Sequence, residues 1–231
     1  MPPVDAEILA RLQFAFTVSF HILFPTLTIG LAGFLVFFEA QLIRTGEQVW
    51  LRLYRFWVKI FALTFGMGVV SGIVLSYQFG TNWSEWSRIT GPVLGPLIGF
   101  EVLTAFFLAT CLVATGTAIS AFWILSANSW MQTPAGATFN GSHYVVDDWL
   151  AVIFNPSFPY RLMHMTTASY LTTTIFIVGI SAFYLLTDHN REIAKRAFSV
   201  SLWALIVLAP LQIFLGDQHG RASLQRQHVI A

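Results

Sequence analysis

The stretch TVSFHILFPTLTIG, residues 17–30, carries one ionisable side chain, His21, inside a long apolar run. The nearest charged residues are Arg11 and Glu39, so the run is long enough to cross the hydrocarbon core of a bilayer, which takes about 20 helical residues. A histidine at membrane depth is costly without a partner or a function. The stretch therefore predicts a membrane helix and a candidate site together.

The composition of the whole chain favours the same class of protein. Of its 231 residues 56% are hydrophobic and 10% are charged, whereas a soluble domain carries roughly a quarter charged residues. The net charge is +1 and no basic cluster is present, which gives no reason to expect a nucleic-acid partner. The amino-terminal sequence MPPVDAEILAR lacks a basic region and a cleavage site, so the first span is expected to remain. Cys111 stands alone, without a CxxC or CxxCH motif.

Apolar blocks of spanning length alternate with short polar connections, which predicts an all-α polytopic transmembrane helix bundle. We place the blocks at about 12–40, 56–79, 93–131, 160–186 and 198–215. The expected connections are Gln41–Arg55, Gly80–Pro92, Gln132–Pro159 and Thr187–Phe198, with a polar tail from Gly216. No internal repeat separates these blocks, and residues 1–231 are expected to form a single transmembrane helical domain.

The block at 93–131 is too long for one ordinary span and short for two, and the basic residues decide between these alternatives. Cytoplasmic loops collect Lys and Arg. If the block crosses twice, two basic connections face the cytoplasm together; these hold Arg44, Arg52, Arg55 and Lys59 in the first and Arg191, Lys195 and Arg196 in the second. We therefore expect about six spans (five if residues 93–131 cross once), with both ends outside and a tight turn near Thr115–Gly116.

Pairs of glycines at GxxxG spacing offer weak signals for helix packing. They are Gly68–Gly72, Gly91–Gly95 and Gly95–Gly99.

Three ionisable residues fall within the predicted spans: His21, Glu101 and His164. Each one alone could be a neutral packing residue, but in the six-span arrangement all three lie roughly 6–13 Å below the outer face. Groups at one depth suit cofactor ligation near one surface, whereas a proton path would place such groups across the bilayer.

Haem iron fits these residues better than zinc does. A zinc site needs three or four converging ligands, and the chain offers no HxxxH or cysteine pair. Haem needs one or two axial ligands and an apolar, aromatic pocket, and 16% of the residues are aromatic. Met163 and Met165 point away from the His164 direction and are expected to pack. The other histidines are expected in solvated loops or the tail: His143, His189, His219 and His228.

Several segments, taken in order, resemble the amino-terminal part of subunit I of the cytochrome bd quinol oxidases. They are RLQFAFTVSFHILFPTLTIG at 11–30, FGTNWS at 79–84, FEVLTAFFL at 100–108, FWILSANSWMQTP at 122–134, MHMTTASY at 163–170, GISAFYLL at 179–186 and LGDQHG at 215–220. Each segment alone is modest, but their order and combination make the resemblance specific.

The resemblance implies a role for each of the three residues. His21 would ligate the iron of a high-spin haem where oxygen is reduced. Glu101 would be the catalytic carboxylate beside or on the haem at that oxygen site. His164 would be an axial ligand of the low-spin haem b that takes electrons from quinol.

The family further implies a haem-binding subunit of a membrane quinol:oxygen oxidoreductase, a terminal oxidase of the respiratory chain. The cofactors would be haem b and either haem d or a further haem b, with quinol and O2 as substrates. The expected partners are oxidase subunit II, membrane lipid and, as a further candidate, a small single-span subunit. The expected location is the bacterial cytoplasmic (inner) membrane, with several crossings.

The sequence departs from the family pattern at two places. Roughly two dozen residues are missing after Leu108, which explains the short third block, and Ala109 stands near where a second carboxylate would fall. The chain also ends at Ala231, inside the outer quinol loop expected to begin near residue 217. The methionine opposite His164 would lie beyond this end, and a haem with one protein ligand is weakly held. We do not expect the chain alone to be an active oxidase.

Three other readings remain open. A haem-b electron-transfer protein, or an inactive fragment, would bind haem without reducing oxygen. A transporter or channel would be colourless, with ionisable groups at several depths. In a purely structural reading the three residues are satisfied packing groups.

Overall fold

The computed structural model describes residues 5–107 and 113–227. The predictions that concern Leu108, Ala109, Cys111 and His228 lie outside these residues.

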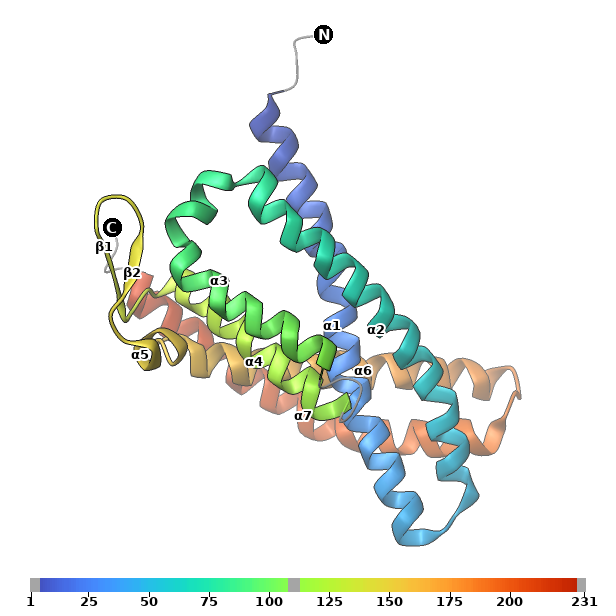
Figure 1. Cartoon of the computed structure of the whole chain (residues 1–231). Helices are drawn as coiled ribbons and strands as arrows, with labels where there is room; N and C mark the ends of the chain where they lie inside the picture. Colours follow the sequence, from blue (N-terminus) through green and yellow to red (C-terminus); the bar gives the residue numbers. More distant parts are fainter. Residues whose placement is uncertain (1–4, 108–112, 228–231) are drawn as a thin grey trace.

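Six long helices form three hairpins. The hairpins are α1 (Ala6–Thr45) with α2 (Gln48–Asn82), α3 (Ser84–Phe107) with α4 (Val113–Gln132), and α6 (Phe158–Leu186) with α7 (Arg191–Gln227). The first hairpin crosses the other two obliquely, and α1 packs against both α4 and α6 (Figure 1). The all-α helix bundle is therefore confirmed, and the block at 93–131 forms two helices.

The helices run past the predicted apolar blocks. Asp5 caps α1 by accepting a hydrogen bond from the Glu7 amide, and Gly46 ends the helix at φ 70°. Three ranges that were expected in connections are helical instead: 48–55, 84–92 and 191–198. Charged and polar residues such as Arg, Gln and Lys are good helix formers, so a helix can continue beyond the hydrocarbon region that hydropathy detects.

The turn between α3 and α4 was predicted at the wrong place. Thr115 and Gly116 lie in the first turn of α4, which begins at Val113. Thr117 Oγ1, one residue later, donates to the carbonyl of Ala114, a bond made within a helix. The helix α3 ends at Phe107 and α4 begins at Val113, and the two helices have 24 and 20 residues.

A small folded segment joins α4 to α6. It consists of the antiparallel strands β1 (Ala137–Phe139) and β2 (Tyr144–Val146), paired with Thr138 opposite Val145, followed by the short helix α5 (Trp149–Ile153). Asn155 is fully buried at the end of α5, and its Nδ2 donates to Ser129 Oγ on α4 at 2.9 Å. This hydrogen bond ties the segment to α4 immediately before α6 begins.

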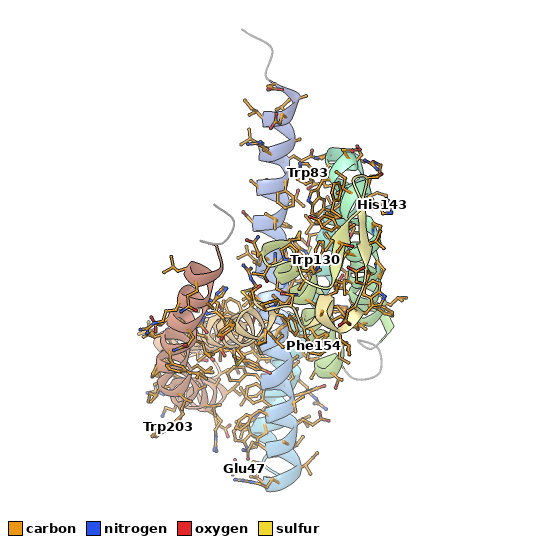
Figure 2. All side chains as sticks on the ribbon, turned by 90° about the vertical axis from the view of Figure 1, so that its left-hand side faces the viewer. Glu47, Trp83, Trp130, His143, Phe154 and Trp203 are labelled. Carbon is orange, nitrogen blue, oxygen red and sulfur yellow. The ribbon has the colours of Figure 1, made fainter. Side chains whose placement is uncertain are left out.

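Within the part of the chain that the structure describes, four helices are long and apolar enough to cross a membrane by length and composition: α1, α2, α6 and α7. Their outward faces are apolar; Trp203, for example, is 69% exposed on the outer side of α7 (Figure 2). Buried residues between α1 and α2 form the main core, among them Leu31, Phe38 and Trp57. Apolar outer faces around a packed interior suit a lipid environment.

The two basic connections meet at one end of the bundle. Arg196 pairs with Glu47 at 3.0 Å, and its guanidinium lies 5.2 Å from the ring of Trp50. Arg52 pairs with Glu192 in the same region. Glu47 lies at the opposite end of the molecule from Trp83 and His143 (Figure 2). The shared end that the charge distribution predicted is therefore present.

Candidate functional site

His21 lies on α1 and faces α2, where its Nδ1 is 2.9 Å from Ser71 Oγ. The Ser71 hydroxyl has one proton, and its Oγ lies 2.8 Å from the Met67 carbonyl, to which it donates. When the Ser71 proton stays on a carbonyl of its own helix, at Met67 or at Gly68 (3.1 Å), Nδ1 of His21 is the donor to Ser71. This tautomer leaves the lone pair on Nε2, which is what a neutral histidine needs to ligate a metal.

Small residues on α2 make room for this histidine. A Cβ on Gly72 would lie 3.2 Å from His21 Cε1, and one on Gly68 would lie 3.3 Å from Phe24 Cβ. The GxxxG pair Gly68–Gly72 is thus the place where α1 and α2 approach closely. The described surroundings of the other GxxxG glycines are open: Gly91, Gly95 and Gly99.

Polar pairs continue along the α1–α2 contact from His21 toward the end of the hairpin. Gln78 Nε2 donates to Thr17 Oγ1 at 2.8 Å, and Asn82 Nδ2 donates to Gln13 Oε1 at 2.9 Å. On α1 these residues recur every fourth position up to His21, which puts them on one helix face. His21 therefore lies at one end of a row of polar side chains between α1 and α2.

Glu101 lies on α3 and belongs to a different hairpin. Its Oε1 accepts a hydrogen bond from Ser120 Oγ of α4 at 2.9 Å. Glu101 is partly buried, and this hydrogen bond holds its carboxyl group between the two shorter helices.

His164 lies on α6 and faces α7. Its Nδ1 is 3.1 Å from Gln212 Nε2, and a Cβ on Gly216 would lie 3.6 Å from its Cε1. Its ring centroid is 5.3 Å from that of His219. Positions 212, 216 and 219 are spaced four and three residues apart, so they share one face of α7.

The sequence prediction for His219 was wrong. Residues 216–227 were expected to form a polar tail and the start of a loop near 217, but α7 continues through them to Gln227. His219 is therefore a partly buried neighbour of His164 and not a solvated residue. The four-and-three spacing of Gln212, Gly216 and His219 is the signal that could have revealed it. His189 is exposed, as expected.

Three buried side-chain atoms around His164 have no hydrogen-bond partner among the described residues. They are Arg161 Nε, Gln212 Oε1 and His219 Nε2. Arg161 lies on α6, one turn before His164, and its Nη1 donates to Asn128 Oδ1 of α4 at 2.8 Å. Unpartnered buried polar atoms are rare in proteins, and each one calls for a ligand or another explanation.

The structure holds the three predicted residues in three different hairpins. His21 bonds within α1–α2, Glu101 within α3–α4 and His164 within α6–α7. Their common depth therefore stays a prediction. Within residues 5–107 and 113–227 no group of three or more His, Cys, Asp and Glu side chains could hold a metal ion. Haem iron takes one or two protein ligands and does not require such a group.

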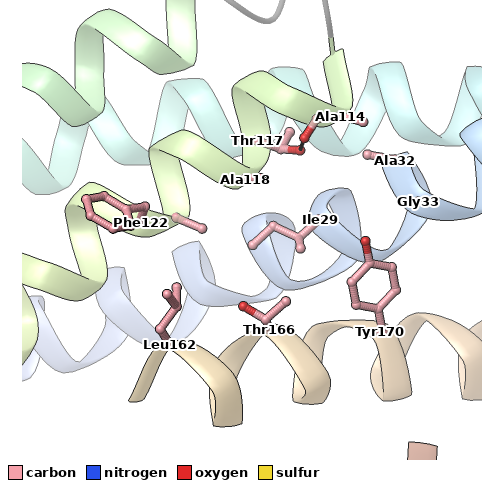
Figure 3. Close-up of a pocket in the computed structure, with 11 residues that line it drawn as sticks. Ile29, Ala32, Gly33, Ala114, Thr117, Ala118, Phe122, Leu162, Thr166 and Tyr170 are labelled. Atoms are coloured by element: carbon pink, nitrogen blue, oxygen red, sulfur yellow. Dashed lines mark hydrogen bonds between the residues drawn. The ribbon is translucent and has the colours of Figure 1, made fainter. Parts of the chain in front are cut away.

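An apolar cavity of about 250 Å³ lies between α1, α4 and α6, with Ile29, Ala118 and Thr166 among its walls (Figure 3). A second cavity of about 440 Å³ lies between α1 and α7. Tyr170 and Gly33 line both cavities, and a Cβ on Gly33 would lie 2.4 Å from Tyr170 Cε1. None of the three predicted site residues lines either cavity.

Comparison with known proteins identifies relatives along nearly the whole chain. The family model for cytochrome bd terminal oxidase subunit I matches residues 9–112 and 107–230. Cytochrome bd-II ubiquinol oxidase subunit 1 of Escherichia coli (strain K12) is 36% identical over 251 residues, which cover 97% of this chain and 48% of that protein. Cytochrome bd ubiquinol oxidase subunit 1 of Bacillus subtilis (strain 168) is 36% identical over 217 residues, covering 84% of this chain and 46% of the relative.

A solved structure shows the same fold. The bd oxidase from Geobacillus thermodenitrificans superposes with a TM-score of 0.90 at 23% identity, over 96% of this chain and 56% of that chain. The chain thus spans about half the length of the proteins it matches. The two family matches meet at residues 107–112, and the alignment of 251 residues is longer than this chain of 231. Both findings fit a segment that relatives carry and this chain lacks.

Proposed function

The chain belongs to the cytochrome bd terminal oxidase subunit I family, and from this premise we propose that it is a haem-binding part of a quinol:oxygen oxidoreductase. It is a multi-pass protein of the bacterial inner membrane, with four helices able to span the bilayer. When bound, haem supplies one-electron transfer from quinol and the reduction of O2 to water. The cofactors we propose are haem b and either haem d or a further haem b.

His21 is the proposed ligand of a high-spin haem. The observation that carries this assignment is its contact with Ser71, which orients the imidazole ring and leaves Nε2 with a lone pair. Ligating histidines generally use their other ring nitrogen for such a hydrogen bond. Gly72 provides the space for the ring against α2.

His164 is the proposed axial ligand of the low-spin haem b. Gln212 lies against its Nδ1, and the amide oxygen and nitrogen of a glutamine are assigned from the hydrogen-bond network. Turning this amide by 180° places Oε1, which has no partner among the described residues, where it accepts a hydrogen bond from the Nδ1–H group. In that arrangement Nε2 of His164 carries a lone pair for iron, and the Gln212 amide, whose nitrogen lies 3.4 Å from Nε2, must move off this nitrogen when iron binds.

Glu101 is the proposed catalytic carboxylate. Ser120 donates to Oε1, so the group is held in place while its other oxygen can accept or release a proton. A partly buried carboxyl group that is held by one hydrogen bond suits proton delivery to a reacting oxygen species.

The proposed partners are oxidase subunit II, a small single-span subunit and membrane lipid, with quinol and O2 as substrates. Because the chain covers about half of its relatives, the complete reaction is proposed for the assembled oxidase.

A reduced-minus-oxidised visible spectrum tests this proposal. We expect the purified chain to show a haem b band that His164→Ala abolishes, whereas His21→Ala removes only high-spin haem. His189→Ala is the matched control, because this histidine is exposed in the α6–α7 loop. A helical, membrane-inserted chain that binds no haem would contradict the proposal.

A second candidate function is electron transfer without oxygen reduction. The observation that favours it is the division of the family match into two parts, 9–112 and 107–230, which overlap close after Glu101. Exposing the reduced protein to oxygen distinguishes the two functions, since only an oxidase consumes oxygen catalytically.

A further inference from the structure

The contact between α6 and α7 contains more polar groups than an axial haem ligand requires. Arg161, Gln212 and His219 surround His164, and each has a buried side-chain atom without a partner. Gln212 is explained as the hydrogen-bond partner of His164 Nδ1. Arg161 Nε and His219 Nε2 are then left, from two helices, in the same cluster.

These two nitrogens suit one type of ligand. The Nε of an arginine is always a donor, and a histidine Nε2 that carries the proton is a donor as well. Two donors at one place match the two oxygens of a carboxylate, and an arginine is well suited to such a group. A ligand carboxylate would satisfy both atoms.

No described carboxylate of the chain fills this role. Six arginines form ion pairs within residues 5–107 and 113–227, namely Arg11, Arg52, Arg88, Arg191, Arg196 and Arg221. Arg161 is in none of these pairs, and the hydrogen bond of its Nη1 goes to the neutral amide of Asn128. Asp217, close to His219 in sequence, pairs with Arg221 instead. A partly buried cation without a counter-ion is expensive near a membrane, which argues for an anionic ligand.

We propose that Arg161 and His219 bind a propionate carboxylate of the haem ligated by His164. Arg161 precedes His164 by three residues on α6, so the two side chains lie on the same helix face, and His219 faces His164 from α7. Protohaem carries its carboxylates on the same molecule as the iron. The propionate edge would therefore face the end of the bundle where α6 begins and α7 ends. This inference rests on the proposed haem-binding function of His164.

Binding of two porphyrins to the haem-free chain tests the proposal. The probes are iron protoporphyrin IX and its dimethyl ester, which differ only in the two carboxylates. The ratio of their dissociation constants reports the carboxylate contact and is independent of overall folding losses, as in a double-mutant cycle. We expect the ester to bind the parent chain about tenfold or more weakly, the effect of losing a charge-assisted hydrogen bond.

Substitutions in the cluster test which side chains cause the difference in affinity between the two porphyrins. Arg161→Gln is expected to bring the ratio close to one, Arg161→Lys to keep part of it, and His219→Ala to reduce it. Arg221→Gln is the control, since that arginine lies on the same stretch of α7 and has its own partner in Asp217. His164→Ala removes binding at this site and identifies any signal from elsewhere.

Each outcome decides between the two proposals. If the parent chain binds both porphyrins equally, or if Arg161→Gln keeps the parent ratio, the carboxylate site is wrong while the haem function stands. If the parent binds neither porphyrin, both proposals fail.

Discussion

His21 and His164, the two proposed haem ligands, each contact one polar side chain that orients the imidazole ring. Ser71 holds His21 from α2, and Gln212 holds His164 from α7. In both cases the partner lies on the other helix of the same hairpin. The sequence alone identified both histidines by their apolar surroundings, but their partners could not be identified, because they depend on how the helices pair in space.

Gln212→Leu removes the partner of His164 and leaves the size of the side chain similar. Second-sphere partners of metal-binding histidines typically contribute 10- to 100-fold in affinity, so we expect haem affinity to fall by about tenfold or more. Haem titration followed by visible absorbance measures the change. Gln225→Leu, at an exposed position of the same helix, is expected to leave the affinity unchanged. Equal effects in the two variants would contradict the role of Gln212.

The Glu101–Ser120 hydrogen bond is expected to stabilise the α3–α4 hairpin. A double-mutant cycle with Glu101→Gln and Ser120→Ala should give a coupling free energy of roughly 0.5–1.5 kcal/mol. Unfolding in mixed detergent micelles measures it. Ser76→Ala serves as the control, because the Ser76 hydroxyl bonds only to the Gly72 carbonyl of its own helix. A coupling of zero would mean that the two groups do not interact.

At the scale of helices, the apolar blocks located every long helix but not their ends. The helix predicted from the apolar block at 198–215 extends from Arg191 to Gln227 in the structure. Charged and polar residues beyond an apolar block can extend its helix. That extension brings His219 to His164. A method based on hydropathy cannot detect it, since residues 216–227 are polar and are held by their contact with α6.

Gly30 lies in close contact with α6. A Cβ at this position would lie 2.2 Å from Thr173 Oγ1 and 2.7 Å from the Ser169 carbonyl oxygen, and the backbone cannot move aside easily. We expect Gly30→Ala to lower the free energy of unfolding by about 1–3 kcal/mol. Gly95→Ala, where nothing lies within 4 Å, should be neutral or stabilising. Thermal unfolding in detergent compares the two, and an equal shift in both would exclude the close crossing.

Asn155 fixes the segment between α4 and α6. Its side chain is fully buried and bonds to Ser129 Oγ, the Ser126 carbonyl and the Val152 carbonyl. Asn155→Ala removes these hydrogen bonds from a buried site, so we expect a loss of roughly 1–3 kcal/mol in the free energy of unfolding. Protease sensitivity near the β1–β2 hairpin should rise in parallel. Thr138→Ala, in the exposed hairpin, is the matched substitution and should change neither measurement.

For the whole molecule, the ion pairs between the two basic connections define a common end. The distribution of Lys and Arg predicted this arrangement, and the pairs Glu47–Arg196 and Arg52–Glu192 confirm it. The β1–β2 segment and α5 within 132–159 were not foreseen, because short strands held by buried Asn and Ser leave no periodic signal. The angle at which the α1–α2 hairpin crosses the others also depends on packing that no sequence pattern records.

Single cysteines test this arrangement in intact membranes. In a Cys111→Ser background, Thr45→Cys and Thr187→Cys should react with an impermeant thiol reagent from one side of the membrane. Ser142→Cys in the β1–β2 hairpin should react only from the other side, because the hairpin lies at the opposite end of the bundle. Labelling of Thr45→Cys and Thr187→Cys from opposite sides would contradict the paired basic connections.

The unpartnered atoms between α6 and α7 also bear on the lifetime of a newly made molecule. Without the proposed haem, Arg161 on α6 and His219 on α7 keep unsatisfied groups where the two helices meet, and we expect this contact to be weaker for it. A ligand that binds only the folded state stabilises it by an amount that grows with the logarithm of its concentration relative to its dissociation constant. The terminal turns of α7 should therefore open more often in empty molecules, which exposes them to membrane proteases. Quality control would then remove unloaded copies and spare those that carry their cofactor.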